Sequence, residues 1–275
     1  ALVLGPFLIP RATMQSQDDT AAMARFAADY IDLPEPRLGQ SLRIHYRALP
    51  AAQADCRQHF LLLHGFTLNL FTWQDSLAFF AEHGSALAYD QVPYGLSEKY
   101  VPQQWAESEI YTLAAMVERL FRVMDSQAMD AAVLVGSSSG GTLAIQAALR
   151  EPERVAGLVL IAPWVIVKRP TFPAVFVRLP QMGRINLMLG RYLGQSAKIL
   201  EFSYTDASAL SAERLSQARA QTHMADWDLA WGAVLRRSLA TRIEIESRLS
   251  RLDVPILILN GKEDRLVPEA DTTLV

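Results

Sequence analysis

The sequence predicts an α/β protein built on a mostly parallel central sheet. Short apolar runs alternate with segments of helical periodicity, which is typical of a parallel sheet covered by helices on both faces. One long helical stretch interrupts this alternation, and glycine-containing loops follow several of the apolar runs. The chain has 275 residues, about half of them apolar, which is enough for one such domain with an insertion.

The first part of the chain carries the opening strands of this sheet. Residues 41–49 alternate between polar and apolar, whereas residues 59–65 form a continuous apolar run that ends at a glycine, as a buried central strand does. We expect a helix over 72–84, which also ends at a glycine. Residues 85–90 then predict a short strand that leads into a loop containing Pro and Gly.

The middle of the chain continues the alternation. Its clearest helix is marked by one apolar stripe at helical spacing, formed by Leu113, Met116, Val117, Leu120, Phe121 and Met124. Residues 131–136 then predict a strand, residues 140–152 a helix, and residues 155–165 another strand. These elements extend the parallel sheet.

A helical insertion follows. From about 167 to 248 the pattern is helical and rich in Leu and Arg, and the strand pattern resumes only at 254–261. We interpret the insertion as a cap, because both its ends leave from strand carboxyl ends, where such sheets bind ligands; an ordinary helical subdomain is the alternative. The expected division is an N-terminal segment (1–39), a first core part (40–165), the cap (166–250) and an incomplete second core part (251–275).

A nucleophile motif occupies the turn between the strand at 131–136 and the next helix. The stretch GSSSG matches the pattern G-x-S-x-G in its required strand-to-helix context. Only Ser138 has glycine both two residues before and two residues after it, at Gly136 and Gly140. The register therefore predicts Ser138 as the nucleophile. The alternative is a Ser/Gly-rich turn that only starts a helix.

Two further loops supply what a serine nucleophile needs. The developing oxyanion requires hydrogen-bond donors, and we expect these to be the backbone N–H groups of Ser139 and of Phe66, which follows Gly65. We interpret His64 as a structural histidine that braces this loop. A carboxylate just past a strand can orient a catalytic histidine. Asp264 is the better candidate for this role and Glu263 the lesser one, and a solvated charged loop is the alternative reading.

Together these residues resemble a known family. The stretches HGF, YDQVPYGLSEK, GSSSGG and NGKEDRLVP, over roughly residues 40–275, are similar in order and spacing to the α/β-hydrolase fold superfamily. The chain looks most like its branch of lipases, esterases and meta-cleavage C–C hydrolases, which carries a helical cap between the sixth and seventh strands. The resemblance implies Ser138 as nucleophile, Asp264 as acid and no cofactor. A serine at 138 disagrees with the dehalogenase and epoxide hydrolase branches, which use Asp.

The catalytic histidine is missing from its family position. In this fold it follows the acid and one more strand, yet no histidine occurs between Asp264 and Val275. We therefore expect the last strand, the histidine and the closing helix beyond residue 275, and we expect the 275-residue chain to be nearly inactive. His223, in the cap, is a weak alternative base. The remaining histidines have no catalytic context: His45, His59 and His83.

Composition excludes several other functions. The net charge is −3 with both signs spread along the chain, so nucleic acid is not an expected partner. The single cysteine and the five histidines show no metal-ligand spacing, and we expect no metal. The N-terminus, ALVLGPFLIP, is apolar and uncharged, and resembles the end of the hydrophobic N-terminal segment of some bacterial relatives. It predicts a surface segment or, preferably, the remnant of a membrane anchor, so a cytoplasmic and a membrane-anchored bacterial location both stay open.

The sequence therefore predicts a serine hydrolase that cleaves a small apolar carboxylic ester through an acyl-enzyme intermediate. Two alternatives remain open. One is hydrolysis of a C–C bond of the meta-cleavage type, which would use the same triad. The other is a binding protein with the hydrolase fold that has kept the pocket but not turnover.

Overall fold

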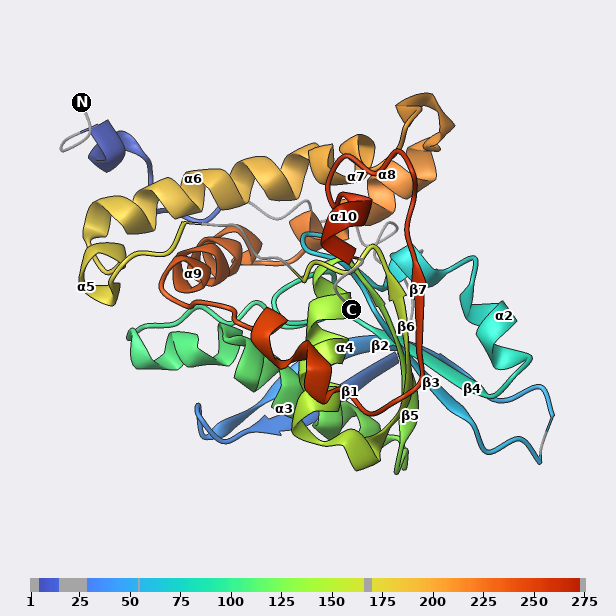
Figure 1. Cartoon of the computed structure of the whole chain (residues 1–275). Coiled ribbons are helices and arrows are strands. Elements are labelled where there is room, and N and C mark those ends of the chain that lie inside the picture. Colours follow the sequence, from blue (N-terminus) through green and yellow to red (C-terminus); the bar gives the residue numbers. More distant parts are fainter. Residues whose placement is uncertain (1–4, 15–28, 54, 166–169, 273–275) are drawn as a thin grey trace.

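A seven-stranded sheet forms the centre of the protein (Figure 1). The computed structural model describes residues 5–14, 29–53, 55–165 and 170–272. The strands at one edge pair antiparallel and the others pair parallel, so the predicted mostly parallel sheet flanked by helices is confirmed. Their spatial order is β1 (Asp29–Glu35), β2 (Gln40–Leu49), β4 (Ser85–Tyr89), β3 (His59–Leu63), β5 (Ala132–Ser137), β6 (Val155–Ile161) and β7 (Ile256–Leu259).

The sheet begins earlier in the chain than predicted. Strand β1 lies within the expected N-terminal segment 1–39, so the sheet starts before the boundary predicted at residue 40. Pro34 makes this strand hard to recognise in the sequence, because proline has no N–H to donate to a neighbouring strand and so argues against a strand. It is tolerated because β1 is the edge strand and pairs only with β2, placing Pro34 opposite Ser41.

Alternate residues of β3 face two different hydrophobic cores. Leu61 and Leu63 belong to the larger core, which includes residues of α3 (Leu113–Ser126) and α4 (Ser139–Arg150). Leu62 faces the smaller core, with α2 (Leu77–Ala81). The stripe predicted for residues 113–124 is therefore the buried face of α3, whereas the helix predicted over 72–84 is a 3-10 turn at Leu70–Trp73 followed by the short α2.

The insertion between β6 and β7 consists of helices in its described residues: α5 (Ala174–Val177), α6 (Pro180–Ser196), α7 (Lys198–Phe202), α8 (Ala212–Ala218) and α9 (Trp227–Leu239). Helix α6 runs along the outer edge of the molecule and crosses α9 closely (Figure 1). Gly194 permits this approach, because a Cβ there would lie 2.1 Å from the Trp227 ring. Trp227 and Trp231, four residues apart on α9, are buried at this crossing.

Short helices complete the chain. A four-residue helix, α10 (Glu269–Thr272), follows β7. Five further 3-10 turns lie at Ala106–Tyr111, Pro152–Arg154, Ala207–Ala209, Ala220–His223 and Glu246–Arg251. Within the described residues, no helix has both the length and the apolar character needed to cross a membrane.

The N-terminal residues lie on the cap. After a 3-10 turn at Gly5–Leu8, backbone carbonyls of residues 7–12 accept hydrogen bonds from Arg184 and Arg191 of α6, at 2.6–3.0 Å. Asp228 of α9 is fully buried, pairs with Arg191 at 2.8 Å and accepts from the Thr13 hydroxyl at 3.0 Å. The rest of the expected anchor remnant, residues 1–4 and 15–28, falls outside the described residues.

Candidate active site

Ser138 stands at a sharp turn between β5 and α4. Its φ of +51° and ψ of −118° form a strained conformation that is rare for a residue with a side chain. The turn is held in place because the Ser138 N–H donates to the Ile161 carbonyl at 2.9 Å, and the Ser138 carbonyl accepts from the Trp164 N–H at 3.1 Å. Such over-determined strain is typical of functional positions.

Close backbone contacts explain the glycine register around this turn. A Cβ at Gly136 would lie 2.5 Å from the Gly140 carbonyl oxygen, and a Cβ at Gly140 would lie 2.2 Å from that of Leu63. Both separations are well below ordinary contact, so only glycine fits at either position. The Gly140 contact also brings the start of α4 against the end of β3, where the Gly65 loop begins.

The two expected oxyanion donors flank Ser138. Ser139 is the first residue of α4, so its N–H has no partner within the helix. Gly65 and Phe66 line the same cavity as Ser138, and a Cβ at Gly65 would lie 3.4 Å from the Ser138 Cβ. The loop after β3 thus lies beside the Ser138 turn, with room for little more than one added carbon atom between Gly65 and Ser138.

His64 braces this loop, as the sequence predicts. Its Nε2 accepts from the Gln91 backbone N–H at 3.0 Å, so its Nδ1 carries the proton and donates to the Gly65 carbonyl at 2.8 Å. The Gln91 side chain in turn donates to the His64 carbonyl at 2.8 Å. Burial lowers the pKa of His64 and keeps the ring neutral. With both nitrogens engaged, His64 holds the loop and is not the base.

Asp264 lies in the loop after β7 and lines the Ser138 cavity. Its Oδ1 accepts from the backbone N–H groups of Leu266 and Val267, both at 2.8 Å, which fixes the carboxylate. Its Oδ2 has no such backbone donor among the described residues. Glu263, the lesser candidate, is exposed and is not among the cavity-lining residues. The structure therefore places Asp264, rather than Glu263, in the cavity that Ser138 lines.

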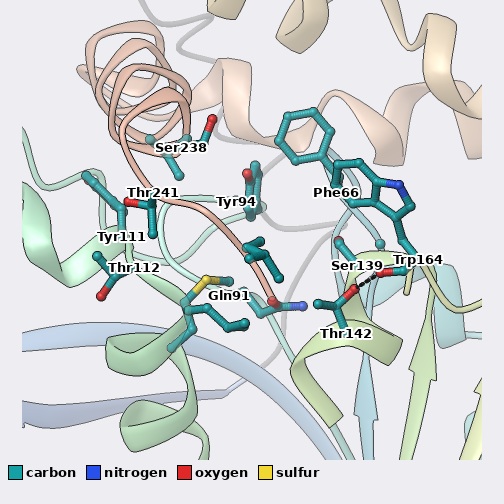
Figure 2. Close-up of a pocket in the computed structure, with 15 residues that line it drawn as sticks. Phe66, Gln91, Tyr94, Tyr111, Thr112, Ser139, Thr142, Trp164, Ser238 and Thr241 are labelled. Atoms are coloured by element: carbon teal, nitrogen blue, oxygen red, sulfur yellow. Dashed lines mark hydrogen bonds between the residues drawn. The ribbon is translucent and has the colours of Figure 1, made fainter. Parts of the chain in front are cut away.

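The cavity over Ser138 has a volume of about 460 Å³, and the cap contributes Ile199 and Ser203 to its wall. A second cavity of about 260 Å³ adjoins it, and Phe66 and Trp164 line both. Figure 2 shows these two rings at one end of the second cavity, with Ser238 of α9 at the other. The Thr142 hydroxyl fixes the backbone beside this boundary by donating to the Trp164 carbonyl at 2.5 Å.

None of the chain's five histidines lines either cavity within the described structure. His45 is buried against Asp90, with 2.6 Å between Nδ1 and Oδ2, and His59 Nδ1 lies 2.6 Å from the Ser85 hydroxyl. His223 ends a 3-10 turn of the cap. Among the described residues, no group of three His, Cys, Asp or Glu side chains could hold a metal ion.

Asp90 organises the loops around the site, a role that the sequence analysis did not assign. It is fully buried, and its carboxylate accepts from the Leu70 and Leu96 backbone N–H groups, both at 2.7 Å, besides pairing with His45. Burial raises its pKa, but the charge and hydrogen bond of His45 outweigh this and lower the pKa below its usual value. The sequence does contain a signal for this role: Asp90 directly follows a buried strand and directly precedes a loop that contains Pro and Gly.

Lys99 closes the same loop. Its buried ammonium group donates to the backbone carbonyls of Tyr94, Gly95 and Ser97. Burial lowers its pKa to about 7, although Asp90 and Glu98 act in the opposite direction. The loop therefore positions Gln91 and Tyr94, which line the second cavity.

Comparisons with known proteins agree with this geometry. Residues 54–275 match the sequence model of the family described as serine aminopeptidase, S33. A 2-hydroxy-6-oxononadienedioate/2-hydroxy-6-oxononatrienedioate hydrolase from Paraburkholderia phymatum is 31% identical, over 84% of this chain and 77% of its own length. A pimeloyl-[acyl-carrier protein] methyl ester esterase from Klebsiella pneumoniae is 29% identical, over 78% of each chain.

Solved structures of hydrolases have the same fold as this chain. The crystal structure of a probable hydrolytic enzyme from Pseudomonas aeruginosa superposes with a TM-score of 0.67 at 23% identity, covering 89% of this chain and 78% of that one. The predicted resemblance to α/β hydrolases is confirmed. The chain belongs to the serine aminopeptidase S33 family and is a hydrolase of the α/β-hydrolase superfamily.

Proposed function

We propose that this hydrolase is a serine esterase that cleaves a neutral, apolar carboxylic ester through an acyl-enzyme intermediate. The observation that carries the proposal is the strained Ser138, which shares one cavity with a carboxylate, Asp264, fixed by backbone N–H groups. These are the nucleophile and the orienting acid of a Ser-His-Asp triad.

The reaction follows from these positions. Ser138 Oγ attacks the ester carbonyl carbon while its proton passes to an imidazole nitrogen, and Asp264 Oδ2 accepts a hydrogen bond from the other ring nitrogen. The N–H groups of Phe66 and Ser139 stabilise the oxyanion of the tetrahedral intermediate. The intermediate collapses to the acyl-enzyme as the alcohol leaves with the proton, and water then hydrolyses the acyl group.

The cavity linings favour a neutral ester over a dicarboxylate. The relative from Paraburkholderia is named for a dienedioate substrate, which carries two carboxylates. Neither cavity is lined by an Arg or Lys among the described residues, and the charged lining residue beside Ser138 is itself an acid, Asp264. An anionic substrate would thus be desolvated without a cation to pair with it. The relative from Klebsiella, by its name, acts on a methyl ester.

The second cavity suits the apolar part of such an ester. Its wall combines apolar side chains such as Met116 and Val234 with hydroxyl groups, and its described lining contains no charge. A cavity of about 260 Å³ has room for several methylene groups. We assign this cavity to an acyl chain of medium length, with Met116 at its wall.

The test labels the nucleophile with a fluorophosphonate probe. Since none of the five histidines lines the cavity, imidazole is supplied in solution as the base, and mass spectrometry locates the adduct. We expect imidazole-dependent labelling at Ser138 and its loss in Ser138→Ala. Ser137→Ala and Ser139→Ala are matched controls that keep labelling, because the proposal uses only the backbone of Ser139. Labelling at a different serine would overturn the assignment of Ser138, and no labelling at all would favour the binding-protein alternative.

A further inference from the structure

One long segment of the chain, residues 155–200, differs in charge from the rest of the protein. Residues 155–200 contain no Asp or Glu, although the protein as a whole has a net charge of −3. The same stretch has six basic residues: Lys168, Arg169, Arg178, Arg184, Arg191 and Lys198. Its described part includes α5 and α6, the outer helices of the cap. Among the described residues, Arg191 pairs with Asp228 and Lys198 with Glu201, so the net positive charge of this cap edge comes from Arg178 and Arg184.

The same helices expose apolar side chains. Of the sixteen large apolar side chains that are exposed in the described residues, eleven lie in residues 5–8 and 172–204. Helix α6 buries Leu187 and Gly190 against α9 but exposes Met188 and Tyr192 on its outer side. A helix that is apolar on both sides lacks the polar outer face expected beside water.

The N-terminal turn extends this surface. Arg184 donates to the carbonyls of Phe7 and Ile9 at 2.8 and 2.6 Å, and its guanidinium lies 5.1 Å from the centre of the Phe7 ring. The neighbouring Leu8 is 86% exposed. The turn thus adds two exposed apolar residues next to α6 (Figure 1).

Arginines accompany the apolar residues. Burial lowers the pKa of Arg236, and the charges of Arg11 and Arg178 lower it further, so the three guanidinium groups act on one another. Arg236 donates to the carbonyls of Val177 and Arg178 at the end of α5, at 2.8 and 2.7 Å. Arg11 and Arg178 are exposed. An exposed positive group therefore stands beside the exposed Val175 and Phe176.

We propose that this cap face, made of the Gly5–Leu8 turn, α5, the outer side of α6 and the flanking arginines, docks on an anionic phospholipid bilayer. Apolar side chains enter the lipid interface while arginines meet the phosphate groups, as in interfacial proteins. A second copy of the chain fits less well, because a two-fold contact through this face would place the Arg11 and Arg178 charges of both copies in one interface with no added carboxylate from the face itself.

Docking would also orient the active site. Helix α6 is followed by α7, where Ile199 lines the Ser138 cavity and Phe202 is exposed. The cap face and the cavity wall are thus consecutive parts of one chain segment (Figure 1). The inference stands independently of ester hydrolysis, since it concerns where the protein binds and not what it cleaves.

The test is co-sedimentation of the whole chain with vesicles of phosphatidylcholine alone or of equimolar phosphatidylcholine and phosphatidylglycerol. We expect binding to the anionic vesicles to exceed binding to the neutral ones. The double variant Val175→Asp/Phe176→Asp should bind at least about tenfold more weakly. Phe79→Asp is the matched control: Phe79 is 57% exposed, like Phe176 at 58%, but lies on α2 at the opposite end of the molecule (Figure 1), and its binding should equal wild type.

A second variant tests the charges without altering the apolar residues. Arg11→Glu/Arg178→Glu should weaken binding to anionic vesicles by about fivefold or more per arginine, and should not affect binding to neutral ones. Equal binding of wild type to both vesicles, or wild-type binding by both double variants, would overturn the proposal. So would a wild-type dimer in solution that the apolar double variant dissociates without any change in vesicle binding.

Discussion

Gly140→Ala tests the link between the helix start and the oxyanion loop. The added Cβ would lie 2.2 Å from the Leu63 carbonyl oxygen and 2.7 Å from that of His64, whereas ordinary contact begins near 3.4 Å. The difference, 3.4 − 2.2, means that α4 and β3 must separate by about 1.2 Å. Overpacking of this kind costs about 1–3 kcal/mol of folding free energy. A displacement near 1 Å in positioned groups lowers reactivity by about a hundredfold.

The assay measures the imidazole-assisted labelling rate of Ser138 and the free energy of unfolding in urea. The matched control is Gly183→Ala in α6, where an added Cβ would meet its nearest atom, of Arg236, at 3.6 Å. That variant should label like wild type and gain up to about 1 kcal/mol, because alanine favours a helix interior over glycine.

A wild-type labelling rate in Gly140→Ala would refute the reasoning. It would mean that the glycine register around Ser138 reflects turn formation alone, and that the position of α4 against β3 does not set the oxyanion site. Equal destabilisation of both glycine variants would likewise show that the effect is not specific to this contact.

Three further changes test other parts of the site. Asp264→Asn should slow imidazole-assisted labelling of Ser138 by about tenfold to a hundredfold by misorienting the base, with little change in unfolding free energy, because the amide oxygen can still accept both backbone N–H groups. Asp90→Asn should destabilise the protein by about 3 kcal/mol at neutral pH in urea titrations, because it removes the charge that pairs with buried His45. The folded-state pKa of Asp90 is lowered, so this stabilisation is present above the unfolded pKa near 4, and the difference between the two proteins should vanish as pH falls through the folded pKa. Met116→Trp should fill the second cavity and lower labelling by a long-chain fluorophosphonate at least about tenfold relative to a short-chain one; equal effects on both would contradict the acyl-chain assignment.

The parts of the site that obey local rules could be predicted from the sequence. The flanking glycines predict Ser138 as the nucleophile, and the close approaches at Gly136 and Gly140 explain why both positions are glycine. A carboxylate just after a strong apolar strand predicts Asp264 as the acid, and Asp264 lines the Ser138 cavity. In both cases the chain segment itself carries the constraint.

Features that depend on distant partners could not be predicted. Strand β1 contains Pro34, and only its edge position, which the whole sheet determines, makes that residue acceptable. Asp90 is held by groups that are 6 to 45 positions away, so its role is not visible in its own neighbourhood. The second cavity forms where the cap meets the core, and no local pattern describes such a junction.

The attachment of residues 7–12 to α6 also affects the order in which the chain folds. Arg184 and Arg191 are 175 to 181 positions away from the carbonyls that they bind. At a synthesis rate of about 5–20 residues per second, the N-terminal residues leave the ribosome roughly 10–35 seconds before these arginines. During that interval α6 has not yet been synthesised, so Phe7 and Leu8 are exposed to water. Until then they are free to bind other apolar surfaces near the ribosome.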